Sequence, residues 1–239
     1  MVQDPTAGWK DLSPAQAIQL QKEAAGTVIT EDDLPEVTTV AGVDVGFENR
    51  DTARAAIVVL RLADLKPVDY AIARQPVPMP YIPGLLSFRE CPAIVEALSK
   101  LRIRPDLLLC DGQGTAHPRR LGVASHTGIL TGLPAIGVGK SRLTGRHGPV
   151  PDEKGAWTPL EDRGEVIGAV LRTRVGVKPL YVSPGHRISL PTAVHYVMAC
   201  VTRYRLPETT RWADGIASGR GQRWLDKLPL RTADQTGNR

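Results

Sequence analysis

Three acidic residues lie where a carboxylate is costly unless it has a partner or a ligand. Asp44 falls inside the apolar stretch of residues 40–47, and Asp111 closes the apolar run of residues 107–110. Glu90 falls in the first turn of an expected helix. Carboxylates that converge in a dry site suit a hard divalent cation such as Mg²⁺, and two such ions can clamp the attacking and leaving oxygens of a phosphodiester. The acids therefore predict phosphodiester hydrolysis at a metal site.

Two of these acids also have an explanation without chemistry. Asp111 precedes Gly112, and aspartate before glycine is common in turns. Glu90 could merely complement a helix dipole. Asp44 has no comparable explanation, because it shares its strand face with Gly42 and Gly46, which we expect to leave open space around the carboxylate.

Two basic residues near Asp111 are candidates for the same chemistry. Lys140 follows an expected strand in a glycine-rich turn, where its charge could hold a phosphate or stabilise developing negative charge. An ordinary exposed lysine is the alternative. His117 precedes Pro118 in an expected loop and could serve as a base, as a donor to phosphate or as a structural residue.

The segment of residues 79–84 is rich in proline and carries one aromatic side chain. Tyr81 lies between Pro80 and Ile82, with Pro83 next, and prolines on both sides stiffen a loop. A stiff, exposed aromatic loop is suited to insertion between stacked bases. A tyrosine packed on the core is the alternative.

Two nucleotide-binding motifs are only partly present. Gly112 and Gly114 after a strand suggest a dinucleotide-binding turn, but the third glycine would be at position 117, which is histidine. Residues 139–141 resemble the end of a phosphate-binding P-loop, but its first glycine would be at position 134, which is proline. Both motifs are therefore excluded.

Composition is typical of a globular protein with a sizeable core. The chain has 239 residues, of which 42% are hydrophobic and 23% charged, and a net charge of +5 that permits an anionic partner. Its three cysteines form no CxxC pair, which excludes a zinc ribbon, and their odd number without a signal peptide predicts a reducing cytoplasm. No apolar run approaches the ~20 residues of a membrane helix, so we expect no membrane partner. We predict a single domain spanning residues 1–239, with loose ends at about 1–12 and 219–239.

The order of expected elements indicates a mixed α/β sheet flanked by helices. Strands at residues 40–47, 53–62 and 67–74 should pair antiparallel, after which helices and strands alternate. Ligands gather at the carboxyl ends of strands in such sheets, and Asp111 lies at such an end. The other expected strands are residues 107–111, 134–138, 166–171 and 180–183, the expected helices are residues 14–25, 87–101, 119–131, 190–204 and 209–218, and residues 143–163 are expected to be a loop.

Several segments together resemble the endonuclease V family, deoxyinosine-specific nucleases of the ribonuclease-H-like superfamily. The resemblance covers about residues 13–218 and is most specific at residues 79–84 (Met-Pro-Tyr-Ile-Pro-Gly) and 117–122 (His-Pro-Arg-Arg-Leu-Gly). It implies a ribonuclease-H-like mixed sheet, in which three antiparallel strands are followed by parallel strands. The other matching segments are residues 41–47, 86–90, 105–107, 111–112, 123–126, 136–138, 140, 185–187, 204–208 and 210–214.

The resemblance also implies a role for particular acidic and basic residues. Asp44, Glu90 and Asp111 match the family's metal-binding acids, for which Mg²⁺ is the expected ion and Mn²⁺ a substitute. Lys140 and His117 match active-site residues near the scissile phosphate, and Asp214 matches a further active-site acid in many members of the family.

Further matches concern the DNA itself. The stretch Pro80, Tyr81, Ile82 and Pro83 matches the wedge that fills the gap when the damaged nucleotide leaves the stack. Gly114 and Gly122 match backbone positions that line the lesion pocket.

The implied activity is cleavage of the second phosphodiester bond 3′ to deoxyinosine, which leaves a 3′-hydroxyl and a 5′-phosphate. The expected partner is DNA containing deoxyinosine, the expected state is a monomer, and RNA containing inosine stays open as a second substrate. One alternative is a nucleic-acid-binding protein that has kept the fold and lost catalysis; the presence of Asp214 and Lys140 argues against it. Another is a structure-selective nuclease such as a junction resolvase, and the Tyr81 loop argues against that one.

Overall fold

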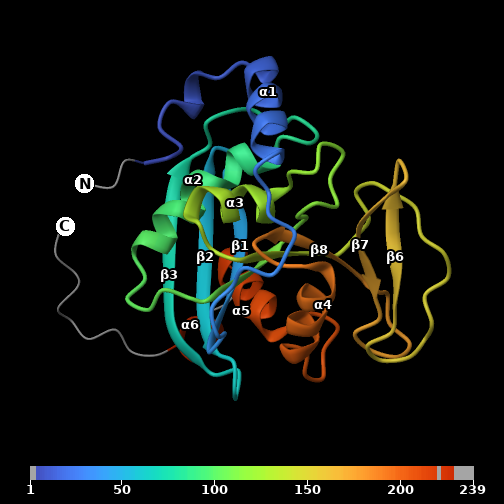
Figure 1. Ribbon diagram of the computed structural model, residues 1–239. Helices are drawn as coiled ribbons and strands as arrows, with labels where there is room; N and C mark the ends of the chain where they lie inside the picture. Colours follow the sequence, from blue (N-terminus) through green and yellow to red (C-terminus); the bar gives the residue numbers. More distant parts are fainter. Residues whose placement is uncertain (1–3, 220–221, 229–239) are drawn as a thin grey trace.

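A computed structural model of the chain describes residues 4–219 and 222–228, which form an eight-stranded sheet with helices on both faces (Figure 1). The strand order is β3-β2-β1-β4-β5-β8-β7-β6. The strands are β1 (Thr39–Glu48), β2 (Thr52–Arg61), β3 (Pro67–Pro76), β4 (Leu107–Asp111), β5 (Ala135–Gly139), β6 (Trp157–Asp162), β7 (Glu165–Leu171) and β8 (Leu180–His186). The helices are the 3-10 turn η1 (Trp9–Asp11), α1 (Pro14–Ala25), α2 (Leu86–Ser99), α3 (Val123–Thr131), α4 (Leu190–Ala199), α5 (Glu208–Ala217) and α6 (Gln222–Leu225).

The sheet is mixed, as the sequence predicts. Strand β2 pairs antiparallel with both β1 and β3, and β4 then runs parallel to β1 and β5 parallel to β4. The parallel part ends there, because β8 is antiparallel to β5, β7 to β8 and β6 to β7. The parallel strands β1, β4 and β5 therefore lie side by side in the middle, and their carboxyl ends meet at one edge of the sheet.

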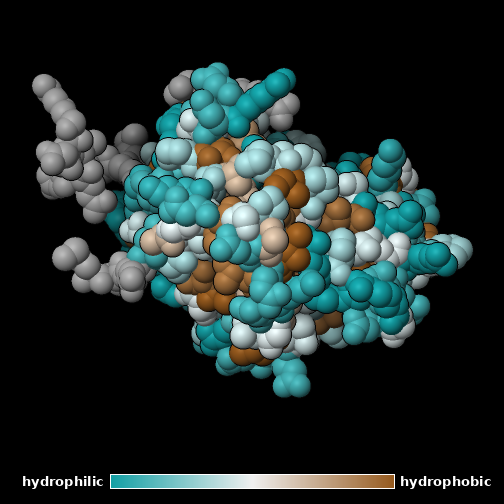
Figure 2. All heavy atoms as spheres, turned by 90° about the horizontal axis from the view of Figure 1, so that it is seen from above, coloured by the Kyte–Doolittle hydropathy of each residue, from teal (hydrophilic) through white to brown (hydrophobic). Residues whose placement is uncertain are grey.

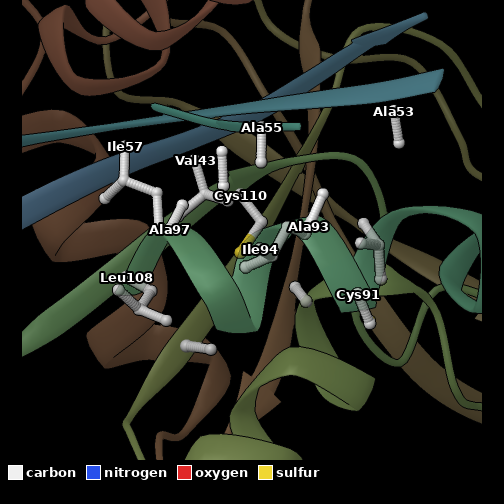
Figure 3. Close-up of a cluster of buried hydrophobic side chains, with 14 of the residues drawn as sticks. Val43, Ala53, Ala55, Ile57, Cys91, Ala93, Ile94, Ala97, Leu108 and Cys110 are labelled. Carbon is white, nitrogen blue, oxygen red and sulfur yellow. The ribbon is translucent and has the colours of Figure 1, made fainter. Parts of the chain in front are cut away.

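Successive side chains of the central strands pack into two separate hydrophobic cores, one on each face of the sheet. Val43 and Ile57 face α2, where they meet Ile94 and Ala97 (Figure 3). Their chain neighbours point to the opposite face, into a second core formed with α4 and α5. Because side chains alternate across a strand, β1 and β2 are buried on both faces.

Two of the predicted helix starts are confirmed by their caps. Ser13 accepts a hydrogen bond from the Gln16 amide, and the Gln16 side chain bonds back to the Ser13 amide, which completes a capping box at the start of α1. Ser189 caps α4 with a single bond, its hydroxyl accepting from the Thr192 amide. Polar side chains thus satisfy the first free amides of both helices.

Two predicted helices are shorter in the structure. The helix expected over residues 119–131 begins only at Val123, because Arg120 has a positive φ of 61° and the chain before it turns. The helix expected over residues 190–204 ends at Ala199. Beyond it the chain is held in a bend, in which Arg205 donates to the carbonyl groups of Lys140 and Lys178.

Three segments expected to be irregular carry regular or buried structure. Strand β6 lies within the expected loop of residues 143–163, and Leu160 is its single fully buried side chain. At the amino end, the ring centroids of Trp9 and Phe88 lie 4.7 Å apart. The expected loose end therefore stops before Trp9 and does not extend to residue 12. At the carboxyl end, α6 packs Trp224 against Trp212, so the part of the expected loose end that includes α6 is ordered. Residues 1–3, 220–221 and 229–239 lie outside the described part.

The three cysteines, Cys91, Cys110 and Cys200, are free and buried. Burial raises the pKa of each thiol, that of Cys200 to about 12. All three therefore stay protonated at neutral pH and act as small apolar side chains of the two cores.

The surface is mixed in polarity. On the face seen from above in Figure 2, hydrophobic side chains gather near the middle and are bordered by hydrophilic ones. None of the helices in the described part of the chain has the length and apolar character that crossing a bilayer requires.

Candidate active site

Asp44 and Asp111 are brought together by the pairing of β1 with β4. Val43 pairs with Cys110 in this parallel ladder, so the two acids follow at adjacent positions on neighbouring strands. Asp111 also pairs with Val138 of β5, and Lys140 comes directly after that strand. The carboxyl ends of three adjacent strands thus place two acids and one lysine at one edge of the sheet.

A third acid, Asp214, is supplied by α5, which lies against β1 at Gly42 and Gly46. A Cβ atom on Gly42 would overlap the carbonyl oxygen of Thr209, and one on Gly46 would overlap that of Ala217. The prediction that these glycines leave open space around Asp44 is therefore wrong. The helix backbone fills that space, and the close approach carries Asp214 to Asp44.

The three aspartates form a cluster that could hold a metal ion. Asp44, Asp111 and Asp214 each offer a carboxylate oxygen, and these oxygens lie within 4.8 Å of one another. Glu90 is buried on α2 and is not one of this group, although the charges of Asp44 and Asp111 reach it. A set of converging carboxylate oxygens matches the preference of Mg²⁺ and Mn²⁺ for oxygen donors.

The electrostatics of the cluster show a concentration of negative charge that Lys140 compensates only in part. Burial, followed by the charge of Asp111, raises the pKa of Asp44 to about 7. Burial raises the pKa of Asp111 as well, although the Lys140 ammonium opposes the rise. The pKa of Glu90 is raised well above its ordinary value by burial and then by Asp44 and Asp111. A divalent cation among these groups would remove the repulsion.

Lys140 bridges two of the acids. Its Nζ forms an ion pair with Asp111 and donates to Asp214 Oδ1 at 3.0 Å. Burial alone would lower the pKa of Lys140, but the bonds to Asp111 and Asp214 outweigh it and raise that pKa. Lys140 is therefore a fixed positive charge beside the aspartates. This geometry favours the functional role of Lys140 over the alternative of an ordinary exposed lysine.

A cavity of about 330 Å³ opens next to these residues. Tyr81, His117 and Gly122 line it together with Asp111 and Lys140, so one cavity joins the expected wedge and the expected pocket to one acid of the cluster. Gly114 does not line the cavity. It packs behind the wall, where its amide donates to Ser183 Oγ at 2.9 Å and a Cβ atom would overlap the Pro184 carbonyl.

The loop of Pro80, Tyr81, Ile82 and Pro83 connects β3 to α2. The side chain of Tyr81 is 66% exposed, which excludes the alternative of a tyrosine packed on the core, whereas Ile82 packs against the core of the α2 face.

The base of this loop is anchored at Gly84, whose carbonyl accepts hydrogen bonds from Gln21 at 2.8 Å and from Arg119 at 2.9 Å. The exposed aromatic side chain thus projects from a fixed base.

His117 is buried and bonded to the backbone on two sides. Its Nδ1 accepts from the Arg119 amide at 3.1 Å, and the ring also bonds to the backbone of Gly84. Burial and the Arg119 charge lower the pKa of His117 to about 4. His117 is thus a neutral residue at pH 7 that ties the loop before α3 to the wedge loop.

Arg89 is a site residue that the sequence analysis missed. Its guanidinium lies 4.8 Å from the ring centroid of Phe47 and 5.8 Å from that of Tyr81, and the residue is only 8% exposed. Its Nε is buried without a hydrogen-bond partner in the described part of the chain. A charged residue directly before Glu90 was the available signal, since both fall on the buried side of α2.

Comparisons with known proteins agree with this geometry. Residues 22–215 match the family model of endonuclease V. Endonuclease V of Roseiflexus sp. (strain RS-1) is 59% identical over 206 residues, which cover 86% of this chain and 92% of that protein. The crystal structure of endonuclease V from Streptomyces avermitilis superimposes with a TM-score of 0.84 at 44% identity, covering 88% of this chain and 93% of that one.

A third relative was crystallised with nucleic acid. Endonuclease V of Ciona intestinalis, in complex with a 24mer DNA containing an inosine followed by a ribo-adenosine, matches with a TM-score of 0.74 at 29% identity, covering 86% of this chain and 96% of that one. Family model, relatives and structures all carry the same nuclease name. The chain therefore belongs to the endonuclease V family and is an endodeoxyribonuclease.

Proposed function

We propose that the enzyme cuts DNA containing deoxyinosine at the second phosphodiester bond 3′ to the lesion and leaves a 3′-hydroxyl and a 5′-phosphate. The observation that carries the proposal is the cavity that Tyr81 lines together with Lys140 and Asp111, one member of the aspartate cluster. The inosine-containing DNA bound to the Ciona relative supports the choice of lesion.

The donor set fits a hard divalent cation. Asp44 and Asp111 would hold Mg²⁺ with Glu90 and Asp214 beside them, and Mn²⁺ would substitute because it accepts the same oxygen donors. When bound, the ion would supply Lewis-acid stabilisation to the phosphate oxygens. Burial, followed by the charge of Asp111, raises the pKa of Asp44 to about 7, so a cation among these groups would favour the ionised carboxylates.

The residues of the chain share the remaining work. Lys140, already charged and held by Asp111 and Asp214, would stabilise negative charge that develops on the phosphate. Tyr81 would occupy the space left in the stack when the inosine turns into the cavity. His117 and Gly122 line that cavity, and the neutral His117 would hold its shape. All these groups come from one chain, so a monomer suffices.

One cleavage assay separates this proposal from its alternatives. The enzyme with Mg²⁺ is incubated with labelled duplexes that contain inosine or no lesion, with a four-way junction and with inosine-containing RNA. We expect incision of the inosine duplex alone among the DNA substrates, and a loss of at least ~10³-fold in the Asp44→Ala and Asp111→Ala variants. Cleavage of the junction would indicate a resolvase, and binding of inosine DNA without incision would indicate a binding protein. The RNA arm decides whether ribose is accepted.

A further inference from the structure

A second cavity, of about 370 Å³, lies beside α5 and α6, and its lining is disjoint from that of the active-site cavity. Three aromatic rings, four cations and one acid, Glu208, line it, and we call it the aromatic cleft. Its rings and cations are Tyr204, Trp212, Trp224, Arg203, Arg211, Arg223 and Lys227. Positive charge interleaved with aromatic faces is the pattern of surfaces that bind unpaired nucleotides.

The centre of the cleft is preorganised by Arg211. Its guanidinium lies 3.4 Å from the ring centroid of Tyr204 and 5.7 Å from that of Trp224. Glu208 accepts two hydrogen bonds from Arg211, at 2.8 and 3.0 Å, and thereby fixes its position. Arg211 therefore fixes the positions of the Tyr204 and Trp224 rings, and its charge is neutralised by Glu208.

Trp224 is held firmly on its other side. Its ring meets Trp212 edge to face, with centroids 5.0 Å apart and an interplanar angle of 73°. The backbone of Gly215 comes so close that a Cβ atom there would lie 2.6 Å from the indole. The half-buried indole is therefore a rigid wall of the cleft.

The remaining cations of the cleft form no ion pair with an acid of the described part of the chain. These cations, Arg203, Arg223 and Lys227, are exposed. Arg203 lies 4.9 Å from the ring centroid of Tyr204. A ligand that fits must therefore carry negative charge together with a flat ring, which describes a nucleotide with its phosphate.

The cleft is linked to the active site through α5 and the bend before it. Arg211 and Asp214 lie on the same helix, three residues apart, so they share a face. Arg205, next to Tyr204, donates to the carbonyl of Lys140 at 2.8 Å. A DNA strand bound at the aspartate cluster would thus have a positively charged surface beside it. Trp224 and Lys227 lie beyond residues 22–215, the range that matches the family model.

We propose that the aromatic cleft binds an unpaired nucleotide of the substrate strand outside the lesion cavity, with the base against the aromatic rings and the phosphate at Arg203, Arg223 and Lys227. Stacked neighbours in a duplex cover the faces of a base, and pairing holds the base in the stack, so an unpaired nucleotide is required. Binding of a nucleotide by the cleft is argued from the residues of the cleft alone. Only the statement that this nucleotide belongs to the DNA strand being cut rests on the proposed function.

The test uses the full chain without divalent metal and a fluorescent oligothymidylate that lacks inosine, so that lesion recognition and cleavage play no part. Trp224→Leu removes the stacking face, and the pair Arg223→Glu and Lys227→Glu reverses the free charges. The matched control is Lys10→Glu with Lys154→Glu, which changes the net charge equally at two exposed lysines outside the cleft. Thymidine monophosphate is the competitor that represents a free nucleotide.

We expect Trp224→Leu to weaken oligothymidylate binding about tenfold, within the range for loss of one base stack. The charge-reversed pair should weaken it further and flatten its salt dependence, while the control pair follows the wild type. Unchanged affinity in the charge-reversed protein, with its melting temperature preserved, would overturn the proposal. So would competition by the monophosphate as strong as that by the oligonucleotide. Failure to incise inosine DNA would overturn the proposed function and leave these results untouched.

Discussion

Gly42 of β1 and Thr209 of α5 are in direct backbone contact, because a side chain on Gly42 would begin where the Thr209 carbonyl lies. This contact sets the separation between helix and sheet at the position where both carry a catalytic-site acid. Asp44 follows Gly42 on the same strand face, and Asp214 follows Thr209 on the helix. The approach of two backbones thus determines how closely two carboxylates can meet.

Gly42→Ala should push α5 away from β1 and separate Asp214 from Asp44. We expect the free energy of unfolding to fall by about 1–3 kcal/mol, as for other overpacked cores, and incision of inosine DNA to fall with it. Gly148→Ala is the matched control, because a Cβ atom there would meet only Thr158 Cγ2, at 3.9 Å. Urea unfolding and single-turnover cleavage of both variants measure the effect. Full activity and stability in Gly42→Ala would contradict the contact.

Lys140→Ala should lower the single-turnover cleavage rate more than the affinity for inosine DNA. The Lys140 charge is held beside Asp111 and Asp214, where it acts as negative charge develops on the phosphate. We expect a rate loss of about 10²- to 10³-fold, as for other positioned electrostatic groups. Lys10→Ala, at an exposed lysine, is the control. A weaker affinity with an unchanged single-turnover rate would make Lys140 a backbone anchor instead.

Tyr81→Ala should reduce binding to duplex inosine DNA more than to single-stranded inosine DNA, because the single strand needs less unstacking. The expected loss on the duplex is roughly ten- to a hundredfold, the range for one aromatic stack. The melting temperature should stay unchanged, since the Tyr81 side chain is 66% exposed. Tyr81→Phe keeps the ring and should retain the preference. An equal loss on both substrates would argue against a wedge.

His126 should make stability depend on pH below neutrality. It is buried between Trp9 and Phe88, and burial lowers its pKa from 6.5 to about 4. The unfolded chain takes up a proton below pH 6.5 and the folded one only near pH 4, so stability is highest above pH 6.5 and falls as the pH drops toward 4. At pH 5 the loss from this residue is about 2 kcal/mol.

The measurement for His126 is the difference in unfolding free energy between pH 7 and pH 5, for the wild type and for His126→Phe. The substituted ring keeps the packing but cannot titrate, and His117, whose pKa is also about 4, is present in both proteins. The wild type should lose about 2 kcal/mol more than the variant. Equal losses would mean that His126 titrates in the folded protein with the same pKa as in the unfolded chain.

Elements with strong local patterns were predictable from the sequence. The bounds of α1 and β4 are those expected, because a capping box starts the first and a continuous apolar run forms the second. Asp44 and Asp111 could be expected to meet, since the carboxyl ends of parallel strands share an edge of the sheet.

What escaped prediction depends on contacts distant in the sequence. Strand β6 buries only Leu160 and therefore lacks the alternation of apolar and polar residues by which a strand is predicted. Trp9 is fixed by α2 and α3, far along the chain. The role of Gly42 depends on the backbone of Thr209, and a glycine gives the same local signal whether its space is empty or filled.

The burial of all three cysteines has a practical consequence for labelling the enzyme. Maleimides and oxidants attack the thiolate, and the raised pKa of Cys91, Cys110 and Cys200 suppresses that form in the folded protein. A cysteine introduced on the surface would therefore react in preference to the three native cysteines. Paired fluorophores or spin labels on the Tyr81 loop and on α6 could then report the distance between wedge and aromatic cleft while DNA is engaged, with no native cysteine replaced.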